Sequence, residues 1–148
     1  MEYKRFGVML DCTARVLKVE TIKKLADVLA KMGYNCIQMY MVDTYELEGY
    51  PWFGYLKGRY TKAELKELDA YMQSKGIELM PCMQTLGHLA GVNKNYAMKY
   101  LFDTDRVLFV GEEKTYEFID KCFETLSECF TSRYINIGLD EAYTIGRG

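Results

Sequence analysis

Two adjacent carboxylates, Asp140 and Glu141, are the residues of this sequence best placed to catalyse a reaction. They follow Ile135, Ile137 and Gly138, a pattern typical of a buried strand of a parallel sheet that ends in a sharp turn. Sites in α/β proteins form at the carboxyl ends of strands, because the loops there vary above a rigid sheet. The two carboxylates could equally cap a following helix, so this stretch alone leaves both interpretations open.

Three further polar residues follow apolar segments earlier in the chain. Asp11 and Asp43 each end such a segment, and His88, the only histidine, lies just beyond a third. Taken alone, His88 is as readily explained by an imidazole that hydrogen-bonds a loop backbone. Acid or imidazole after each of four successive segments nevertheless favours a functional site at one edge of a sheet.

The elements that would position these residues alternate regularly along the chain. Strands are predicted at 6–10, 36–42, 77–83 and from 134 onward, and helices at 20–32, 61–76 and 112–130. Apolar residues at helical spacing indicate the helices, and Thr61 with Glu64 forms a capping box at the start of the second. Residues 93–110 match neither pattern and receive no assignment.

This alternation predicts an α/β fold with parallel strands joined by right-handed crossovers and helices packed outside. An open doubly wound sheet and a barrel both satisfy it. The turn at 11–15 has no glycine-rich phosphate loop, which argues against a nucleotide-binding sheet. A complete (β/α)8 TIM barrel needs about 250 residues. We therefore expect residues 1–148 to form a single domain, a partial barrel of about the first four βα units.

Composition excludes several classes of partner. The net charge is −2, with 19 basic and 21 acidic residues mixed along the chain, so nucleic acid is not expected as a partner. No apolar run approaches the about 20 residues of a membrane span, and the first residues lack the apolar core of a signal peptide. We expect no membrane association and a cytoplasmic location, unless the chain was cut from a longer secreted protein. The five cysteines form no C-x-x-C pair and suit core packing better than disulfides or metal.

The loop at 44–60 is rich in aromatic residues, among them Trp52. Flat aromatic faces beside an acidic site suit the apolar faces of sugar rings. Long loops also need aromatic residues to hold them to the scaffold, so both interpretations remain open.

Several of these motifs together resemble glycoside hydrolase family 20, the β-N-acetylhexosaminidases. The resemblance is carried, in order, by Gly-Val-Met-Leu-Asp at 7–11, Val-Glu-Thr-Ile-Lys at 19–23, Gly-Arg-Tyr-Thr at 58–61, Leu-Gly-His at 86–88 and Gly-Leu-Asp-Glu at 138–141. It covers nearly the whole chain and corresponds to the amino-terminal half of that family's catalytic barrel, so the chain is expected to be truncated.

The resemblance implies a retaining glycoside hydrolase that removes terminal N-acetylglucosamine or N-acetylgalactosamine from an oligosaccharide or glycoconjugate, without a cofactor or metal. The substrate's own acetamido oxygen attacks the anomeric carbon and forms an oxazolinium ion, an exception to the two-carboxylate scheme. Asp140 would match the residue that orients the acetamido group, and Glu141 the general acid and base. Asp43 and His88 would match a relay that hydrogen-bonds toward Glu141.

One position departs from the family pattern. A sugar-binding arginine usually stands five residues before the aspartate of the first strand, where this chain has Phe6, and Arg5 lies one residue earlier. A shift of one residue on a strand points the side chain to the opposite face. Arg5, reaching round through a local bulge, and Trp52 are the candidate sugar-binding residues.

Two alternatives remain. A non-catalytic carbohydrate-binding or assembly protein could keep the half-barrel and form a homo-oligomer through its exposed strand edges. A metal-dependent barrel enzyme could instead use Asp43, His88, Asp140 and Glu141 to bind Mn or Mg. The second has weaker support, since the chain has a single histidine and no acidic spacing motif.

Overall fold

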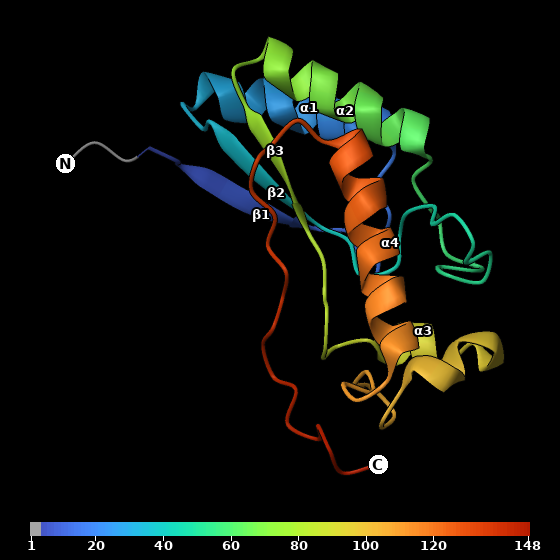
Figure 1. Cartoon of the computed structure of the whole chain (residues 1–148). Helices are drawn as coiled ribbons and strands as arrows, with labels where there is room; N and C mark the ends of the chain where they lie inside the picture. The colour runs from blue at the N-terminus through green and yellow to red at the C-terminus, as the bar shows by residue number, and fades with distance from the viewer. Residues whose placement is uncertain (1–3) are drawn as a thin grey trace.

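A computed structural model describes residues 4–148 and shows a parallel sheet with helices packed outside it (Figure 1). The strands are β1 (Gly7–Asp11), β2 (Cys36–Tyr40) and β3 (Glu78–Cys82), in the order β1-β2-β3. The helices are α1 (Val19–Lys31), α2 (Lys62–Ser74), α3 (Ala90–Asn93) and α4 (Glu113–Cys129), with the 3-10 helix η1 at Tyr96–Leu101. All strand pairs are parallel, as the alternation of elements predicts.

Helices α1, α2 and α4 pack outside the sheet, with α2 in contact with both of the others. In α1, Ile22, Ala26 and Leu29 are buried at helical spacing, and Gly33 follows the helix with a φ of 84°. α2 contacts α1, β3 and α4. The alternating residues Ile37 and Met39 of β2 are fully buried among these helices, so the core lies between the sheet and the helical layer.

The start of α2 follows directly from its sequence. Thr61 Oγ1 accepts a hydrogen bond from Glu64 N at 3.1 Å, and Thr61 N donates to Glu64 Oε2 at 2.8 Å, so the predicted capping box is confirmed. The helices predicted at 20–32 and 112–130 are also confirmed, with ends within one residue of those observed.

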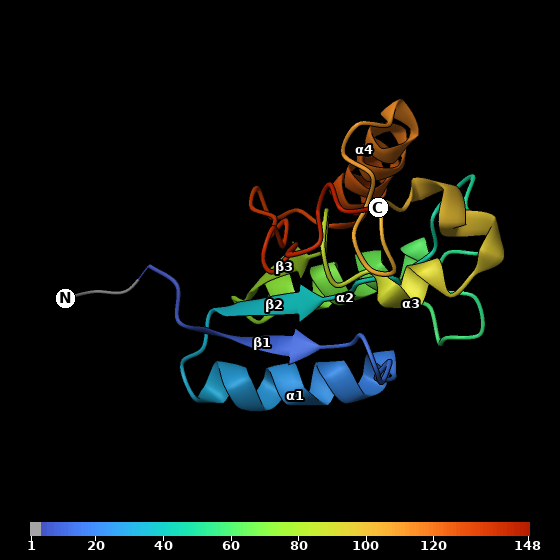
Figure 2. The same cartoon turned by 90° about the horizontal axis from the view of Figure 1, so that it is seen from below.

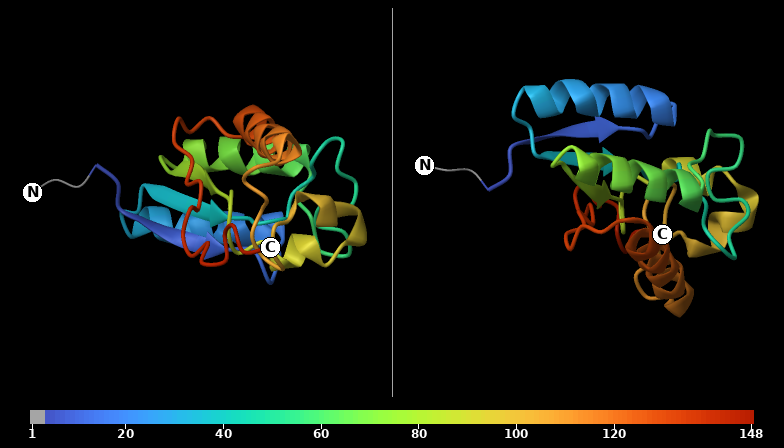
Figure 3. Two further views of the ribbon diagram at one scale, coloured as in Figure 1. Left: turned by 60° about the horizontal axis from the view of Figure 1, so that its bottom comes forward. Right: turned by 90° about the horizontal axis from the view of Figure 1, so that it is seen from above.

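The predicted fourth strand is wrong for most of its length. In the described part of the chain, only Asn136 of this segment pairs with the sheet, through an isolated parallel bridge to Cys82. Asn136 N donates to Pro81 O at 3.0 Å, and Met83 N donates to Asn136 O at 2.9 Å. Pairing stops because the Asn136 side chain accepts from Gly138 N at 3.1 Å and Gly138 turns to a φ of 54°. The segment still follows the edge of β3, on the far side of the sheet from α1 (Figures 2 and 3).

The unassigned residues 93–110 form the end of α3, η1 and a turn closed by an antiparallel bridge between Phe102 and Leu108. Leu101, Val107 and Leu108 are fully buried and hold this segment against the rest of the protein. A short 3-10 helix has no 3.6-residue periodicity, which explains why the sequence pattern gave no signal.

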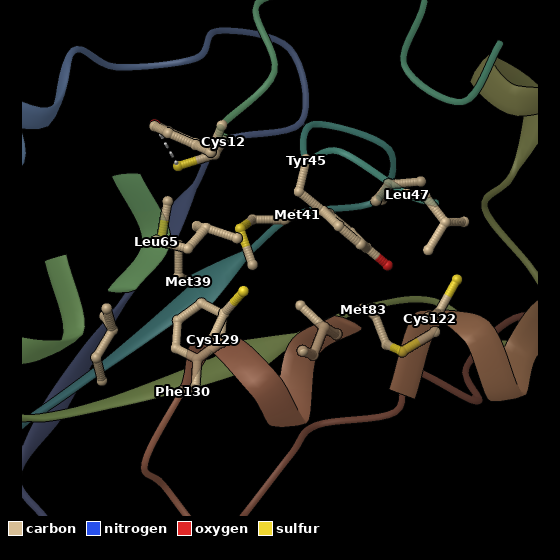
Figure 4. Packing of buried hydrophobic residues seen from close by; sticks show 14 of the residues in the cluster. Cys12, Met39, Met41, Tyr45, Leu47, Leu65, Met83, Cys122, Cys129 and Phe130 are labelled. Atoms are coloured by element: carbon tan, nitrogen blue, oxygen red, sulfur yellow. Dashed lines mark hydrogen bonds between the residues drawn. The ribbon is translucent and has the colours of Figure 1, made fainter. Parts of the chain in front are cut away.

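The five cysteines are free and buried. Figure 4 shows Cys12, Cys122 and Cys129 among core side chains that include Met39 and Met83. Burial raises the pKa of the Cys122 thiol to about 12. The cysteines therefore act as small core residues, as their sequence context predicts. In the described part of the chain, 4–148, no helix is long and apolar enough to cross a membrane.

Candidate active site

Asp140 and Glu141 lie just beyond the point where the chain leaves the edge of β3. The turn before them requires glycine, since a Cβ on Gly138 would overlap the carbonyl oxygen of Met83. Glu141 itself has a φ of 54°, an uncommon conformation for a residue with a Cβ. Both carboxylates are exposed, so they are open to a ligand from solvent.

His88 approaches both carboxylates. Its Nε2 lies 3.2 Å from Asp140 Oδ2 and 3.5 Å from Glu141 Oε2, so a protonated imidazole would pair with either. The loops meet closely because Gly87 has no side chain, and a Cβ there would lie 2.9 Å from the carbonyl oxygen of Asp140. The structure thus brings together three residues from two loops.

Gln84 is a part of this site that sequence reasoning missed. The residue is only 5% exposed, and its Nε2 donates to Asp140 Oδ1 at 3.2 Å and to the Tyr40 hydroxyl at 3.0 Å. The hydrogen bond from Gln84 is the main reason why the pKa of Asp140 falls below its ordinary value, and the backbone amide of Asp140 adds to the effect. Gln84 follows β3 at the same edge as His88, a placement that could have identified it.

A cleft of about 500 Å³ lies beside Asp140. It is lined by the ends of the strands and the turn before the carboxylates: Met9, Tyr40, Cys82, Gln84, Asn136, Gly138, Leu139 and Asp140. Small-molecule sites typically combine such apolar walls with a few polar groups in a space of about 300–1,000 Å³. Burial, followed by the charge of Asp140, raises the pKa of the Cys82 thiol to about 11.

Asp43 does not join this group. Its side chain is buried at the end of the β2 segment, and Oδ1 lies 2.6 Å from Lys57 Nζ. A Cβ on Gly91 would lie 3.5 Å from the other oxygen, Oδ2. Lys57 is thus the charged partner of Asp43, and the described residues show no hydrogen bond from Asp43 to His88 or Glu141, so the relay through Asp43 stays a prediction.

Arg5 lies at the amino ends of the strands, opposite the end that carries the carboxylates. Its Nε is 2.6 Å from Glu78 Oε2, and its guanidinium stacks 3.9 Å above the ring of Tyr134. Glu78 begins β3, whereas Asp140 lies beyond the end of that strand. Phe6 stacks on Tyr34 with ring centroids 4.3 Å apart. The guanidinium is therefore paired at the other end of the strands from Asp140, so the structure does not bring Arg5 to the carboxylates, and its contact with a sugar stays a prediction.

Trp52 also lies apart from the carboxylates. It is exposed and packs edge-on against Tyr55 at 5.0 Å, and it is not among the residues that line the cleft beside Asp140. Tyr45, Phe53 and Tyr60 from the same loop are buried, so these three aromatic residues hold the loop to the scaffold. The structure does not bring Trp52 to the candidate site.

The side chain of Asp11 accepts hydrogen bonds from a residue close by in sequence. Its Oδ1 accepts from the backbone N of Thr13 at 2.8 Å and from the Thr13 hydroxyl at 2.7 Å, which forms a turn after β1. In residues 4–148, no three His, Cys, Asp or Glu side chains are grouped closely enough to hold a metal ion.

Comparison with known proteins identifies the family. The profile described as "Glycosyl hydrolase family 20, catalytic domain" matches residues 3–145. A β-hexosaminidase from Vibrio furnissii is 27% identical over 177 residues, covering 94% of this chain and 29% of the relative. The chain thus spans under a third of that relative's length.

Solved structures give the same result. A mutant β-hexosaminidase from Streptomyces plicatus in complex with its product, N-acetylglucosamine, superposes with a TM-score of 0.86 at 25% identity, over 98% of this chain and 34% of that one. An exo-β-N-acetylglucosaminidase from Vibrio harveyi in complex with N-acetylglucosamine gives a TM-score of 0.81 at 25% identity, over 91% and 27%. The sheet and its outer helices match part of these enzymes, which confirms the partial-barrel prediction in its coarse form. The chain belongs to glycoside hydrolase family 20.

Proposed function

We propose that this chain carries the catalytic carboxylates of a β-N-acetylhexosaminidase that acts by retention. The substrate would be an oligosaccharide or glycoconjugate that ends in N-acetylglucosamine or N-acetylgalactosamine. The observation that carries the proposal is the convergence of Asp140, Glu141 and His88 beside the 500 Å³ cleft. Solved relatives that hold N-acetylglucosamine support the substrate class.

In the proposed first step, the acetamido oxygen of the substrate attacks the anomeric carbon and forms a bicyclic oxazolinium ion. The bond to the leaving-group oxygen breaks, and Glu141 gives that oxygen its proton. In the second step water attacks the anomeric carbon, Glu141 takes a proton from the water, and the ring reopens. Two inversions at one carbon retain the β configuration.

Asp140 suits the role of the ionised partner. The hydrogen bond from Gln84 keeps the pKa of Asp140 below its ordinary value, so its carboxylate is charged at neutral pH. A charged carboxylate can accept the acetamido N–H and stabilise the positive charge that develops as the oxazolinium ion forms. Glu141 is exposed next to Asp140, with Oε2 3.5 Å from His88 Nε2, so its carboxyl group can reach the leaving-group oxygen of a bound substrate.

The cleft provides suitable contacts for a sugar ring. Met9 and Leu139 give apolar surface, and Tyr40 and Asn136 give hydrogen-bonding groups. Asn136 is oriented by its side-chain bond to Gln38 Oε1 at 3.2 Å. A pyranose has apolar faces and a polar rim, so a wall of this mixed character fits it.

The substrate-assisted mechanism makes a clear distinction between two substrates. The assay uses the chain and the full reading frame that contains it, with 4-nitrophenyl N-acetyl-β-glucosaminide and 4-nitrophenyl β-glucoside. Only the first has the acetamido group that forms the oxazolinium ion. We expect release of nitrophenol from the N-acetyl substrate alone, with the β anomer as the first product by proton NMR. Equal rates on both substrates, or an α anomer formed first, would refute the mechanism.

A second candidate function is assembly through self-association. In the described residues, β1 pairs with β2 only, and its other edge is open. Phe6 beside it is 50% exposed and Met9 is 55% exposed. An open strand edge with apolar neighbours can pair with another chain. Light scattering should then show a dimer that Met9→Lys weakens, whereas a wild-type monomer at high concentration would rule this candidate out.

A further inference from the structure

We infer that the turn at 103–107, called here the Asp103 turn, positions Glu141 relative to His88. The inference rests on the proposed function, because the value of this placement lies in the proton transfer assigned to Glu141. The turn lies between the two segments that carry the site: it contacts the residues after His88 on one side and the residues after Glu141 on the other.

On the Glu141 side, the contacts are made by two adjacent side chains. Asp103 Oδ2 accepts from Gly146 N at 2.6 Å, and Asp103 Oδ1 accepts from Gly148 N at 3.1 Å. The Thr104 hydroxyl lies 2.8 Å from the Thr144 hydroxyl. Hydrogen bonds to a charged carboxylate are stronger than those between neutral groups, so Asp103 is the principal anchor.

On the His88 side, the turn is fixed by backbone contacts and burial. Leu89 N donates to Arg106 O at 3.1 Å within the turn, and Leu108 N, directly after the turn, donates to Leu86 O at 3.0 Å, so these bonds reach residues on both sides of His88. Val107 and Leu108 are fully buried. The turn is thus firmly attached to the loop of His88, and it presents Asp103 and Thr104 to the segment that follows Glu141.

The backbone of Glu141 needs such support. A φ of 54° is unfavourable for a residue with a Cβ. Such a conformation persists only where the surrounding structure imposes it. Because Glu141 is exposed, packing around its own side chain supplies little of this constraint. The bonds at Thr144 and Gly146 lie three and five residues further on and restrict the path of the chain through Glu141.

The test compares four variants of the 148-residue chain. Asp103→Ala removes both acceptors, Asp103→Asn keeps one, and Thr144→Val removes the hydroxyl contact with little change of shape. Asp105→Ala is the matched control, since within residues 4–148 its carboxylate pairs with the neighbouring Arg106 and makes no hydrogen bond to the segment after Glu141. Circular dichroism melting checks that each variant folds.

Two NMR measurements report on the coupling without any need for activity. His88 is the only histidine, so its ring signals are unambiguous. In Asp103→Ala, we expect its ring shifts at fixed pH to change and the Gly146 amide to exchange about tenfold faster, as loss of one hydrogen bond implies. Asp103→Asn should recover part of both effects, and Thr144→Val should change the ring shifts in the same direction. Unchanged ring shifts in Asp103→Ala and Thr144→Val, both folded, would overturn the inference.

Kinetics of the full reading frame separate this inference from the proposed function. A misplaced proton donor should lower kcat about 10- to 100-fold in Asp103→Ala with little change in KM. An unchanged kcat in that variant, with an active wild type, would overturn the inference. Altered ring shifts with a wild type that hydrolyses neither aryl glycoside would support the coupling and refute the hydrolysis.

Discussion

Gln84 and Asp140 are 56 residues apart in sequence, and their side chains are joined by a hydrogen bond of 3.2 Å from Nε2 to Oδ1. The same amide nitrogen donates to the hydroxyl of Tyr40, the last residue of β2. One buried amide therefore ties the exposed carboxylate to the edge of the sheet. This bond explains how a residue on an open turn can have both a fixed orientation and a lowered pKa.

Gln84→Leu should raise the pKa of Asp140 toward its ordinary value, because the donor that favours the charged carboxylate is lost. A lowered pKa in the folded protein stabilises the fold above the unfolded pKa, and that stabilisation disappears as the pH falls through the folded pKa. The stability difference between wild type and variant should therefore shrink below about pH 4. Titration of the Asp140 carboxyl carbon by NMR measures the change directly. Gln73→Leu, in α2, is the control, and identical titrations in all three proteins would disprove the role of Gln84.

Lys57→Met should destabilise the fold, because it leaves the buried carboxylate of Asp43 without its cation. Asp43 is 2% exposed and Lys57 is 36% exposed at the side chain. Loss of a partner from a fully buried pair costs about 3–5 kcal/mol, and the partial exposure of Lys57 lowers the expectation to about 1–3 kcal/mol. Urea unfolding measures the difference.

The double variant Asp43→Asn with Lys57→Met should recover most of the loss, since no unpaired charge remains. Lys62→Met, which breaks an exposed pair with Glu128, should cost less than about 1 kcal/mol. Equal effects of Lys57→Met and Lys62→Met would contradict the importance of the buried pair.

Thr61→Ala should lower the free energy of unfolding by about 1 kcal/mol, because it removes the side-chain half of the capping box at the start of α2. For a chain of this size the melting temperature should fall by about 2–4 °C. Lys18→Ala is the matched control, since Lys18 is the N-cap of α1 and makes no side-chain cap bond. A drop of the same size in the control would show that the effect does not come from the cap.

The cysteines should resist alkylation in the folded protein. All five are buried, and burial raises the pKa of Cys82 to about 11, so the reactive thiolate is scarce at pH 8. The thiols of the native protein should react with an alkylating reagent only as fast as the fold opens. In the unfolded chain all five thiols should react at once. Rapid reaction of one thiol in native protein would identify a cysteine that is more accessible than the structure shows.

Much of this fold could be predicted from sequence because its signals are local. The stripe of Ile22, Leu25 and Leu29 defines α1, and Gly33 marks its end. The pair Thr61 and Glu64 fixes the start of α2. Caps and periodicity depend on residues within one or two turns, so no knowledge of distant contacts is needed.

The outcome for the predicted fourth strand could not be foreseen from such local signals. Its alternation of Ile135 and Ile137 is typical of a strand, but a strand exists only where a neighbour offers backbone groups along its length. Here Asn136 alone pairs with β3 in the described residues, and its side chain then satisfies the amide of Gly138. The competing side-chain bond is a local alternative to the ladder.

The candidate site could likewise be predicted only in part from the sequence. The order of the elements places Asp140, Glu141 and His88 at one edge, and the structure brings them together. The partners of Asp43 and Arg5 depend on Lys57 and Glu78, residues that are distant in sequence and that no motif points to. Chain order predicts which edge a residue occupies, and only tertiary contacts decide which neighbour it meets.

The most direct test of the central claim is the rate of hydrolysis of 4-nitrophenyl N-acetyl-β-glucosaminide by Glu141→Gln in the full reading frame. Glutamine keeps the shape of the side chain and removes its titratable proton, so the account predicts a fall in kcat of at least about 100-fold. Glu124→Gln, an exposed change on α4, should leave the rate as it is. An active wild type whose Glu141→Gln variant hydrolyses the substrate undiminished would contradict the account.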